Sequence, residues 1–215
     1  MLHVNSMENF IKNQDEADSW KTIMLLYKAS LKEIGTKLEI LNDEFQNVHQ
    51  YNPIEHIKSR IKEPRSIVDK LKRRGYESTV ENMVRYVNDI AGVRVICSFS
   101  SDIYRIADML ASQSDISLLS VKDYIRTPKE SGYKSYHMIV STPVYLSEGP
   151  VNTKVEIQIR TVAMDFWASL EHKINYKFSG NVPEHIKRDL RSCAEMVSDL
   201  DAKMMDLNEQ VRAIS

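Results

Sequence analysis

In the stretch TKVEIQIR, residues 153–160, polar and apolar side chains alternate from Lys154 onward. Successive side chains of a β-strand point to opposite faces, so Val155, Ile157 and Ile159 are predicted to face one side of a sheet. The opposite face carries four side chains with functional groups: Lys154, Glu156, Gln158 and Arg160. A strand with one apolar face is commonly half solvated, so this strand alone does not separate a wet surface from a functional one.

Further elements are predicted on both sides of this strand. Strands are expected in three segments rich in β-branched and apolar residues: 93–99, 116–125 and 136–142. Helices are expected in four segments: 64–74, 80–88, 102–112 and 161–178. With long helices before and after this mixed centre, the order of elements predicts an α/β (α+β) fold.

The two long helices carry narrow apolar stripes, from Trp20 to Val48 and from Ile186 to Val211, with alternating spacings of four and three. Such a stripe is typical of helices that pack nearly parallel to a partner. The pattern leaves open whether the two helices pack on each other, on the domain core, or between subunits. We expect part of each stripe to project beyond the central domain and to hold a homo-oligomer.

Composition excludes several classes of protein. Of 215 residues, 42% are apolar and the net charge is −1, which suits a globular chain and argues against a DNA partner. No uncharged apolar run of eighteen residues and no secretory signal is present, so no membrane partner is expected. Cys97 and Cys193 suit neither a disulfide framework nor a zinc knuckle. Both are expected to be reduced and buried, which favours a cytoplasmic location.

A local basic segment, residues 56–75, contains eight Lys or Arg and only two acidic residues. On the predicted helix, Ser66, Lys70 and Arg73 share one face. Two further cations precede the helix: Arg60 and Lys62. Cations and a hydroxyl near a helix N-terminus suit phosphate oxygens, although a solvated basic face is the alternative. The chain has no GxxxxGK[ST] motif, so this is not a P-loop.

Asp89 comes just before the buried strand at 93–99, and Arg94 lies inside it. Arg is rarely found in an apolar strand unless its guanidinium has a partner, and Asp89 is one candidate. The alternative is that Asp89 binds a metal while Arg94 stacks on a base or binds phosphate.

In the stretch KESGYKSYHMIV, residues 129–140, Ser131-Gly132 predicts a turn, after which Tyr133 and His137 share one face. Two such rings provide a platform for a planar heterocycle, although a lone Tyr or His is more often a half-buried structural residue. The sequence contains no GxSxG, HExxH, paired CxxC or strand-following GxGxxG, which disfavours serine hydrolases, zinc proteases and Rossmann dehydrogenases.

Taken in order, these segments resemble the synthetase domain of the Rel/Spo alarmone enzymes, above all the stand-alone small alarmone synthetases of the branch that contains RelP and YwaC. The matching stretches are SRIKEPRSIVDKL, DIAGVRVICSF, KDYI, SGYKSYH, VEIQIRT and MDFWASLEHKINYK, within about residues 51–180. The resemblance implies a mixed five-stranded sheet of the nucleotidyltransferase type, flanked by helices. It also implies one synthetase domain over residues 1–215, with a helical region at 15–50, a catalytic core at 51–180 and a C-terminal helix at 183–213.

The resemblance implies a GTP pyrophosphokinase of the stringent response, which transfers pyrophosphate from ATP to the 3′-hydroxyl of GTP or GDP and forms pppGpp or ppGpp. Asp89 and Glu156 would be catalytic and would bind the cofactor Mg²⁺, and whether Glu156 is also a general base stays open. Arg60 and Arg94 would sandwich the adenine of ATP. Its phosphates would be held by Lys62, Ser66, Lys70 and Arg73. The acceptor GTP would be bound by Tyr133, Lys134, His137 and Gln158.

The resemblance further implies a homotetramer. The sequence has no His-Asp dipeptide, around which the hydrolase domain of the long family members is built, so we expect synthesis without hydrolysis. Two alternatives remain: a non-catalytic nucleotide- or RNA-binding regulatory module of the same fold, and a nucleotidyltransferase with another product. Asp89 and Glu156 favour the enzyme, because carboxylates repel phosphate unless a metal is present.

Overall fold

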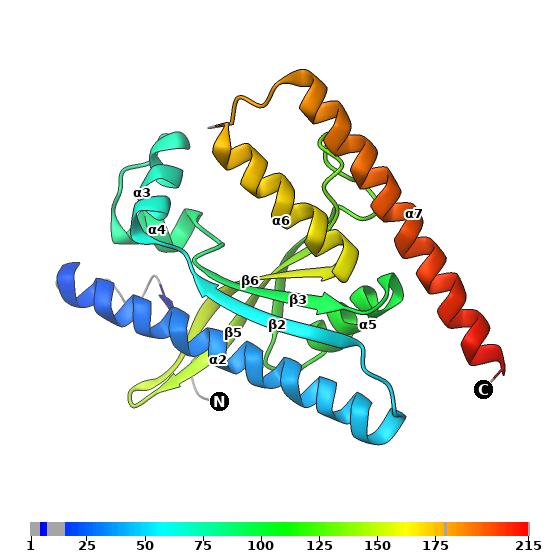
Figure 1. Cartoon of the computed structure of the whole chain (residues 1–215). Helices are drawn as coiled ribbons and strands as arrows, with labels where there is room; N and C mark the ends of the chain where they lie inside the picture. Colours follow the sequence, from blue (N-terminus) through cyan, green and yellow to red (C-terminus); the bar gives the residue numbers. More distant parts are fainter. Residues whose placement is uncertain (1–4, 8–15, 179, 215) are drawn as a thin grey trace.

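The computed structural model describes residues 5–7, 16–178 and 180–214 (Figure 1). Five strands form one mixed sheet in the order β2-β3-β6-β5-β4. Their bounds are β2 Ile54–Ile61, β3 Ala91–Cys97, β4 Ser117–Asp123, β5 Tyr136–Leu146 and β6 Gly149–Thr161. β3 and β6 are parallel, whereas the other neighbours on this path are antiparallel. The two-residue β1, Asn5–Ser6, adds a short parallel pairing to β6. The expected mixed five-stranded sheet is confirmed.

Six helices surround the sheet in the described part of the chain: α2 Glu16–His49, α3 Pro64–Arg73, α4 Val80–Tyr86, α5 Ser100–Ala111, α6 Val162–Lys177 and α7 Glu184–Ile214. Local sequence explains several of their ends. Pro64 occupies the first turn of α3, where its missing N–H costs nothing. The Thr79 and Thr161 side chains cap α4 and α6, accepting hydrogen bonds from the backbone N–H of Asn82 and Met164.

α2 packs along the sheet and supplies one side of the core (Figure 1). Its stripe is buried at Tyr27, Leu31, Ile34 and Leu38, in one cluster with the apolar face of β6. The expectation that part of this stripe projects as an oligomer contact is therefore wrong, apart from the exposed Val48 at its end. A helix that lies across several strands finds enough apolar surface within its own chain.

α7 behaves differently, because only one side of it contacts the rest of the chain. Its inner side packs on α6, where Ala194 joins Trp167 and Ala168 in a small second cluster. Besides Ile214 at its end, α7 exposes five apolar side chains on its outer side, which we call the α7 stripe: Met196, Leu200, Met204, Leu207 and Val211. Cys193 is also exposed, so its predicted burial is wrong, whereas Cys97 is buried as expected. Among the described residues, no helix is both long enough and apolar enough to cross a membrane.

Two strand features were not predicted. One is the strand β2, whose apolar residues stand at 54, 57 and 61, a spacing of three and four that resembles a helix. A bulge between Ile54 and His56 interrupts the alternation that a regular strand would show. β5 and β6 extend as a hairpin well beyond the predicted segments, through Pro143. Pro143 lies past Ser141, the last β5 residue paired with β4, so its missing N–H removes no bond on that side.

Candidate active site

The polar face of β6 meets the start of β3 at one point of the sheet. In the parallel ladder Gly92 lies opposite Glu156, and Asp89 precedes Gly92 by three residues, in the turn that follows α4. Asp89 and Glu156 consequently line one cavity of about 240 Å³, which we call the carboxylate cavity. Its walls also include five side chains that can carry positive charge: Lys70, Arg74, Lys122, Lys129 and His137.

Asp89 is held by two lysines. Lys70 Nζ lies 2.8 Å from Oδ1 of Asp89, and Lys62 Nζ lies 3.1 Å from Oδ2. Burial acts to raise the pKa of Asp89, but the two ammonium groups outweigh it and hold this pKa below its ordinary value. The carboxylate is therefore ionised at neutral pH, with its charge compensated by groups that also suit phosphate.

Glu156 is oriented by neighbours on β5 and β6. Gln158 Nε2 donates a hydrogen bond to Glu156 Oε2 at 2.8 Å, and His137 Nδ1 lies 3.7 Å from Oε1. Burial acts to raise the pKa of Glu156, yet His137 and Gln158 lower it below its ordinary value. Glu156 is thus a fixed, ionised carboxylate within the same cavity as Asp89.

A second cavity of about 240 Å³ lies on the other side of Glu156, and we call it the arginine cavity. Arg60 of β2 and Arg94 of β3 both line it. Arg60 lies over Gly92, since a Cβ at Gly92 would be 3.8 Å from Cγ of Arg60. Arg94 Nη1 lies 3.1 Å from Asp165 Oδ1, so the candidate pair of Arg94 with Asp89 does not form. Glu156 and Gln158 also line this cavity.

Tyr133 is joined to the site through a network of hydrogen bonds. Its hydroxyl lies 2.8 Å from His137 Nε2 and accepts a hydrogen bond from Arg160 Nη2 at 2.6 Å. Arg160 Nη2 also donates to Gln158 Oε1 at 2.9 Å. Lys129 Nζ lies 4.6 Å from the centroid of the Tyr133 ring. The structure thus brings Tyr133, His137 and Gln158 together, three of the residues that the family resemblance implies for the acceptor site.

Five predicted site residues do not line either cavity. Lys62 and Tyr133 still contact cavity residues, Asp89 and His137, whereas the other three lie apart. Lys134 donates to Ser198 Oγ of α7 at 2.5 Å, because it points away from its neighbour Tyr133 in the extended chain. Ser66 and Arg73 lie on α3 and are not among the described residues that line either cavity. Arg74 takes that place at the end of α3, where it lines the carboxylate cavity and donates to the Tyr86 carbonyl at 2.8 Å.

Comparison with known proteins decides the family. Residues 59–181 match the family model described as a region found in RelA/SpoT proteins. The chain belongs to the RelA/SpoT family. It is 48% identical over 194 residues to GTP pyrophosphokinase YwaC of Bacillus subtilis, with 90% of this chain and 92% of that relative covered. GTP pyrophosphokinase YjbM of the same organism is 37% identical, with 90% of each chain covered.

Solved structures of RelA/SpoT proteins share the fold. The crystal structure of the small alarmone synthetase 2 from Bacillus subtilis has a TM-score of 0.81 at 46% identity, covering 89% of this chain and 98% of that one. The small alarmone synthetase 1 from the same organism, bound to its product pppGpp, has a TM-score of 0.84 at 36% identity, covering 91% and 99%. The predicted membership of the small alarmone synthetases of the Rel/Spo family is confirmed.

Several cavity residues of this RelA/SpoT chain were missed as site residues. Lys122 lies directly opposite His137 in the β4–β5 ladder, a pairing that only the register reveals. Lys129 stands four residues before Tyr133, so its spacing was available in the sequence. Arg160 and Asp165 line neither cavity, but they form an ion pair of 3.0 Å beside Arg94, and the polar alternation of β6 had already marked Arg160.

The carboxylates also fit a metal of the kind that phosphate transfer uses. No group of three or more His, Cys, Asp or Glu able to hold a metal occurs within the part of the chain that the structure describes. Mg²⁺ in such sites takes one or two carboxylates, with substrate phosphates and water as its other ligands. Asp89 and Glu156 supply that number from one cavity, so the donor set fits Mg²⁺.

Proposed function

We propose that this chain is a GTP pyrophosphokinase, which transfers the terminal diphosphate of ATP to the 3′-hydroxyl of GTP or GDP and forms pppGpp or ppGpp with AMP. The observation that carries the proposal is that Glu156 lines both the arginine cavity and the carboxylate cavity. A site suited to a base and a site suited to phosphates therefore meet at one carboxylate. The names of YwaC and YjbM support the same activity.

The donor ATP would place its adenine in the arginine cavity. Guanidinium groups are planar and weakly hydrated, so Arg60 and Arg94 suit the two faces of a purine. The phosphates would then enter the carboxylate cavity, where Lys62 and Lys70 now pair with Asp89. Ser66 and Arg73, on the neighbouring face of α3, would complete the phosphate site. Arg74 joins this set because it lines the cavity.

Asp89 and Glu156 would hold Mg²⁺, which supplies neutralisation of the charge that develops on the transferred phosphates. The lowered pKa of Glu156 makes it a weak proton acceptor at neutral pH, which favours a ligand and orienting role over that of a general base. Positioning and charge neutralisation account for most of the catalysis of phosphoryl transfer, so the site needs no covalent nucleophile.

The acceptor would be held from the opposite side, with Tyr133 against its guanine and with His137 and Gln158 between the base and Glu156. Lys134 would contribute from the same loop, although in this structure it bonds to α7. The 3′-hydroxyl oxygen attacks the β-phosphorus of ATP and its proton passes to water, the bond from that phosphorus to the α–β bridging oxygen breaks, and AMP leaves. No second, hydrolytic activity belongs to the proposal.

Assembly as a homotetramer is part of the same proposal and would use the α7 stripe. Its five side chains are 44–60% exposed, and pairing with another subunit would remove them from water. The number four rests on the family resemblance, because an apolar stripe does not choose between a dimer and a tetramer. The one-domain organisation over residues 1–215 and a cytoplasmic location, where ATP and GTP are plentiful, complete the proposal.

Incubation of the purified protein with ATP, GTP and Mg²⁺, followed by nucleotide chromatography, tests the activity. The proposal expects AMP and a pentaphosphorylated guanosine in equal amounts. Binding of both nucleotides without any product would instead support the regulatory module of the same fold. In a parallel incubation with Mn²⁺, added ppGpp should remain intact, and its breakdown would reveal a hydrolytic site.

A further inference from the structure

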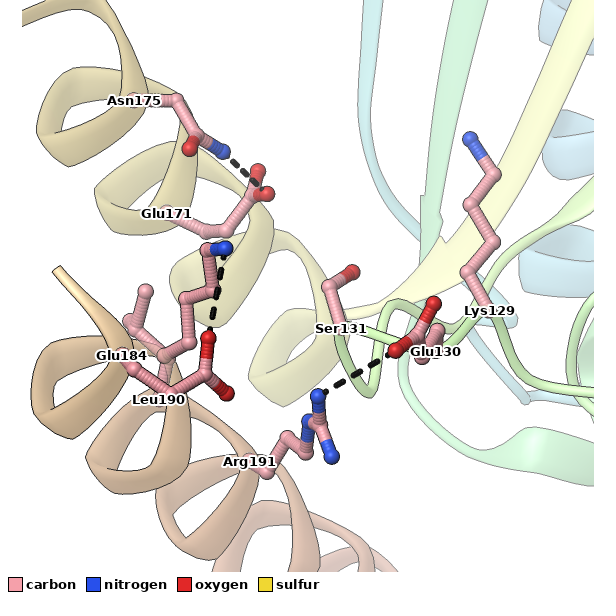
Figure 2. A pocket seen from close by; sticks show the side chains of 9 residues that line it. Lys129, Glu130, Ser131, Glu171, Asn175, Glu184, Leu190 and Arg191 are labelled. Carbon is pink, nitrogen blue, oxygen red and sulfur yellow. Dashed lines mark hydrogen bonds and ion pairs between the residues drawn. The ribbon is translucent and has the colours of Figure 1, made fainter. Parts of the chain in front are cut away.

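A third cavity, of about 400 Å³, lies between the loop at residues 129–134 and the helices α6 and α7 (Figure 2). Its walls include Lys129 and Ser131 from the loop, Glu171 and Asn175 from α6, and Glu184 and Arg191 from α7. Figure 2 shows Glu171 and Asn175 side by side on α6, across the cavity from the loop. We call it the α6–α7 cavity, and its α6 wall has no role in the function proposed above.

The α6–α7 cavity continues the two cavities already described. Lys129 lines both the carboxylate cavity and the α6–α7 cavity, just as Glu156 lines both the carboxylate cavity and the arginine cavity. Lys129 also lies against Tyr133, with Nζ 4.6 Å from the ring centroid. The order along the molecule is therefore arginine cavity, carboxylate cavity, Tyr133 and Lys129, then α6–α7 cavity. An acceptor nucleotide whose sugar lies at Glu156 would direct its base toward the last of these.

Glu171 lies where such a base would end. Ala168, Glu171 and Asn175 share one face of α6, because their spacings are three and four. Tyr133 packs on the cluster that contains Ala168, so Glu171 lies one turn further, roughly 5 Å along the helix axis. Asn175 Nδ2 donates a hydrogen bond to Oε1 of Glu171, which fixes the orientation of the carboxylate.

A carboxylate distinguishes the two purines of this reaction. Guanine presents two adjacent donors, N1–H and the 2-amino group, and a carboxylate accepts both at once. Adenine has an unprotonated N1, whose lone pair a carboxylate repels. An enzyme that binds ATP at one site and a guanosine nucleotide at the other needs such a discriminator. The stacking surface of Tyr133 accepts any purine, so it does not provide one.

Resting on the function proposed above, we propose that Glu171 determines the acceptor specificity, by accepting hydrogen bonds from N1–H and the 2-amino group of guanine. Asn175 is a positioning residue that holds the carboxylate for this contact. A site built to hydrogen-bond a polar group discriminates strongly against an analogue that lacks it, because its own polar atoms then stay unpaired.

The test compares GTP with ITP, which differs from GTP only by the missing 2-amino group. With saturating ATP, the wild type should use GTP at least ~10-fold more efficiently than ITP, by kcat/KM. In Glu171→Gln this ratio should fall to within about threefold of one, and the KM for GTP should rise at least ~10-fold while the KM for ATP stays unchanged. Asn175→Ala, which keeps the carboxylate but frees it, should lower the ratio to an intermediate value.

The matched control is Glu184→Gln, which removes one negative charge from the α7 wall of the same cavity. The Glu184 carboxylate lies 3.4 Å from Lys187 and should leave the ratio at its wild-type value. The proposal would be overturned if the ratio of kcat/KM for GTP to that for ITP stayed unchanged in both Glu171→Gln and Asn175→Ala. It would also be overturned if Glu184→Gln lowered this ratio as much as Glu171→Gln does.

Equilibrium binding of GDP and IDP separates this inference from the proposed function. Calorimetry without ATP measures this binding with no turnover. The wild type is expected to bind GDP more tightly than IDP, and Glu171→Gln is expected to lose this preference. A wild type that makes no alarmone but prefers GDP would refute the activity and keep the specificity role. A wild type that makes alarmone, with no preference for GDP over IDP, would refute the role of Glu171 alone.

Discussion

Gly132 and Ala194 meet where the loop at residues 129–134 crosses α7. A Cβ atom at Gly132 would lie 2.6 Å from Cβ of Ala194, and Gly132 has a φ of 89°, in the left-handed region that favours glycine. The loop that carries Tyr133 therefore rests directly on the helix that carries the α7 stripe. Nearby, the Trp167 indole N–H donates to the Leu190 carbonyl at 2.9 Å and closes the same contact between α6 and α7.

Gly132→Ala should displace this loop. We expect a loss of unfolding free energy of about 1–3 kcal/mol from backbone strain and the steric clash, with a KM for GTP raised more than that for ATP. Gly180→Ala is the matched control, because Gly180 has a φ of 86° with nothing within 4 Å of its Cβ position. Urea unfolding and steady-state kinetics measure both variants, and equal effects on the KM for GTP would show that the contact with Ala194 is irrelevant.

The carboxylate pair gives a second prediction. Asp89→Asn and Glu156→Gln should each reduce turnover by ~100-fold or more, since each removes a charged ligand from a site that works by charge neutralisation. Both changes are nearly isosteric, so thermal unfolding should show folded proteins. Asp69→Asn on the exposed side of α3 is the control and should keep wild-type turnover. Near-normal turnover of either site variant at saturating Mg²⁺ would remove that residue from the mechanism.

The lysines on Asp89 predict a pH dependence of stability. Lys70 and Lys62 lower the pKa of Asp89 in the folded state, so they stabilise the folded protein when Asp89 is ionised. This stabilisation is fully present above the ordinary carboxyl pKa of about 4, and it is lost as the pH falls through the lower pKa of the folded state. The double variant Lys62→Met/Lys70→Met removes the two ammonium groups that lower the pKa of Asp89. Burial of the carboxyl group then raises this pKa. The stability advantage of the wild type over the variant should therefore shrink between pH 7 and pH 3.

Urea unfolding at a series of pH values measures that difference. Lys72→Met, which removes an exposed lysine of the same helix, serves as the control and should give a difference that is flat with pH. A wild-type advantage that stays constant down to pH 3 would contradict the assigned role of the two lysines.

The α7 stripe predicts the assembly state. Replacing Leu200 and Leu207 with Glu puts two charges into the exposed seam and should lower the mass of the assembly, because burying an unpaired charge is costly. Tyr145→Glu, at a side chain 68% exposed near the end of the β5–β6 hairpin, is the control and should leave the mass unchanged. Light scattering after size-exclusion chromatography decides the matter. A wild-type mass near that of one chain, 24.9 kDa, would refute assembly.

Much of this fold follows from local patterns. The alternation of residues 153–160 specified β6 and separated Val155 from Glu156, and the structure keeps these residues on opposite faces of the sheet. β2 escaped prediction because its bulge breaks the alternation on which strand prediction depends. The sequence pattern also treated the stripes of α2 and α7 alike, since periodicity does not say which surface lies opposite.

The candidate site was predictable where one segment carried the whole signal, as for Tyr133 and His137. It was not predictable where two segments meet. Lys122 becomes a cavity residue only through its pairing opposite His137, and Glu171 only through the place of α6 beside the loop at residues 129–134. Arg74 lines the carboxylate cavity and Arg73 does not, because one residue of helix phase, about 100°, decides which side chain points into it.

The central claim is that diphosphate passes intact from ATP to a guanosine nucleotide, and ATP labelled with ³²P in the γ-position tests it most directly. The purified chain is incubated with labelled ATP, GTP and Mg²⁺, and the products are separated by chromatography. The account predicts that the label moves to a guanosine pentaphosphate, with one unlabelled AMP formed for each product molecule. Release of the label as inorganic phosphate, with ADP as the partner product, would contradict it.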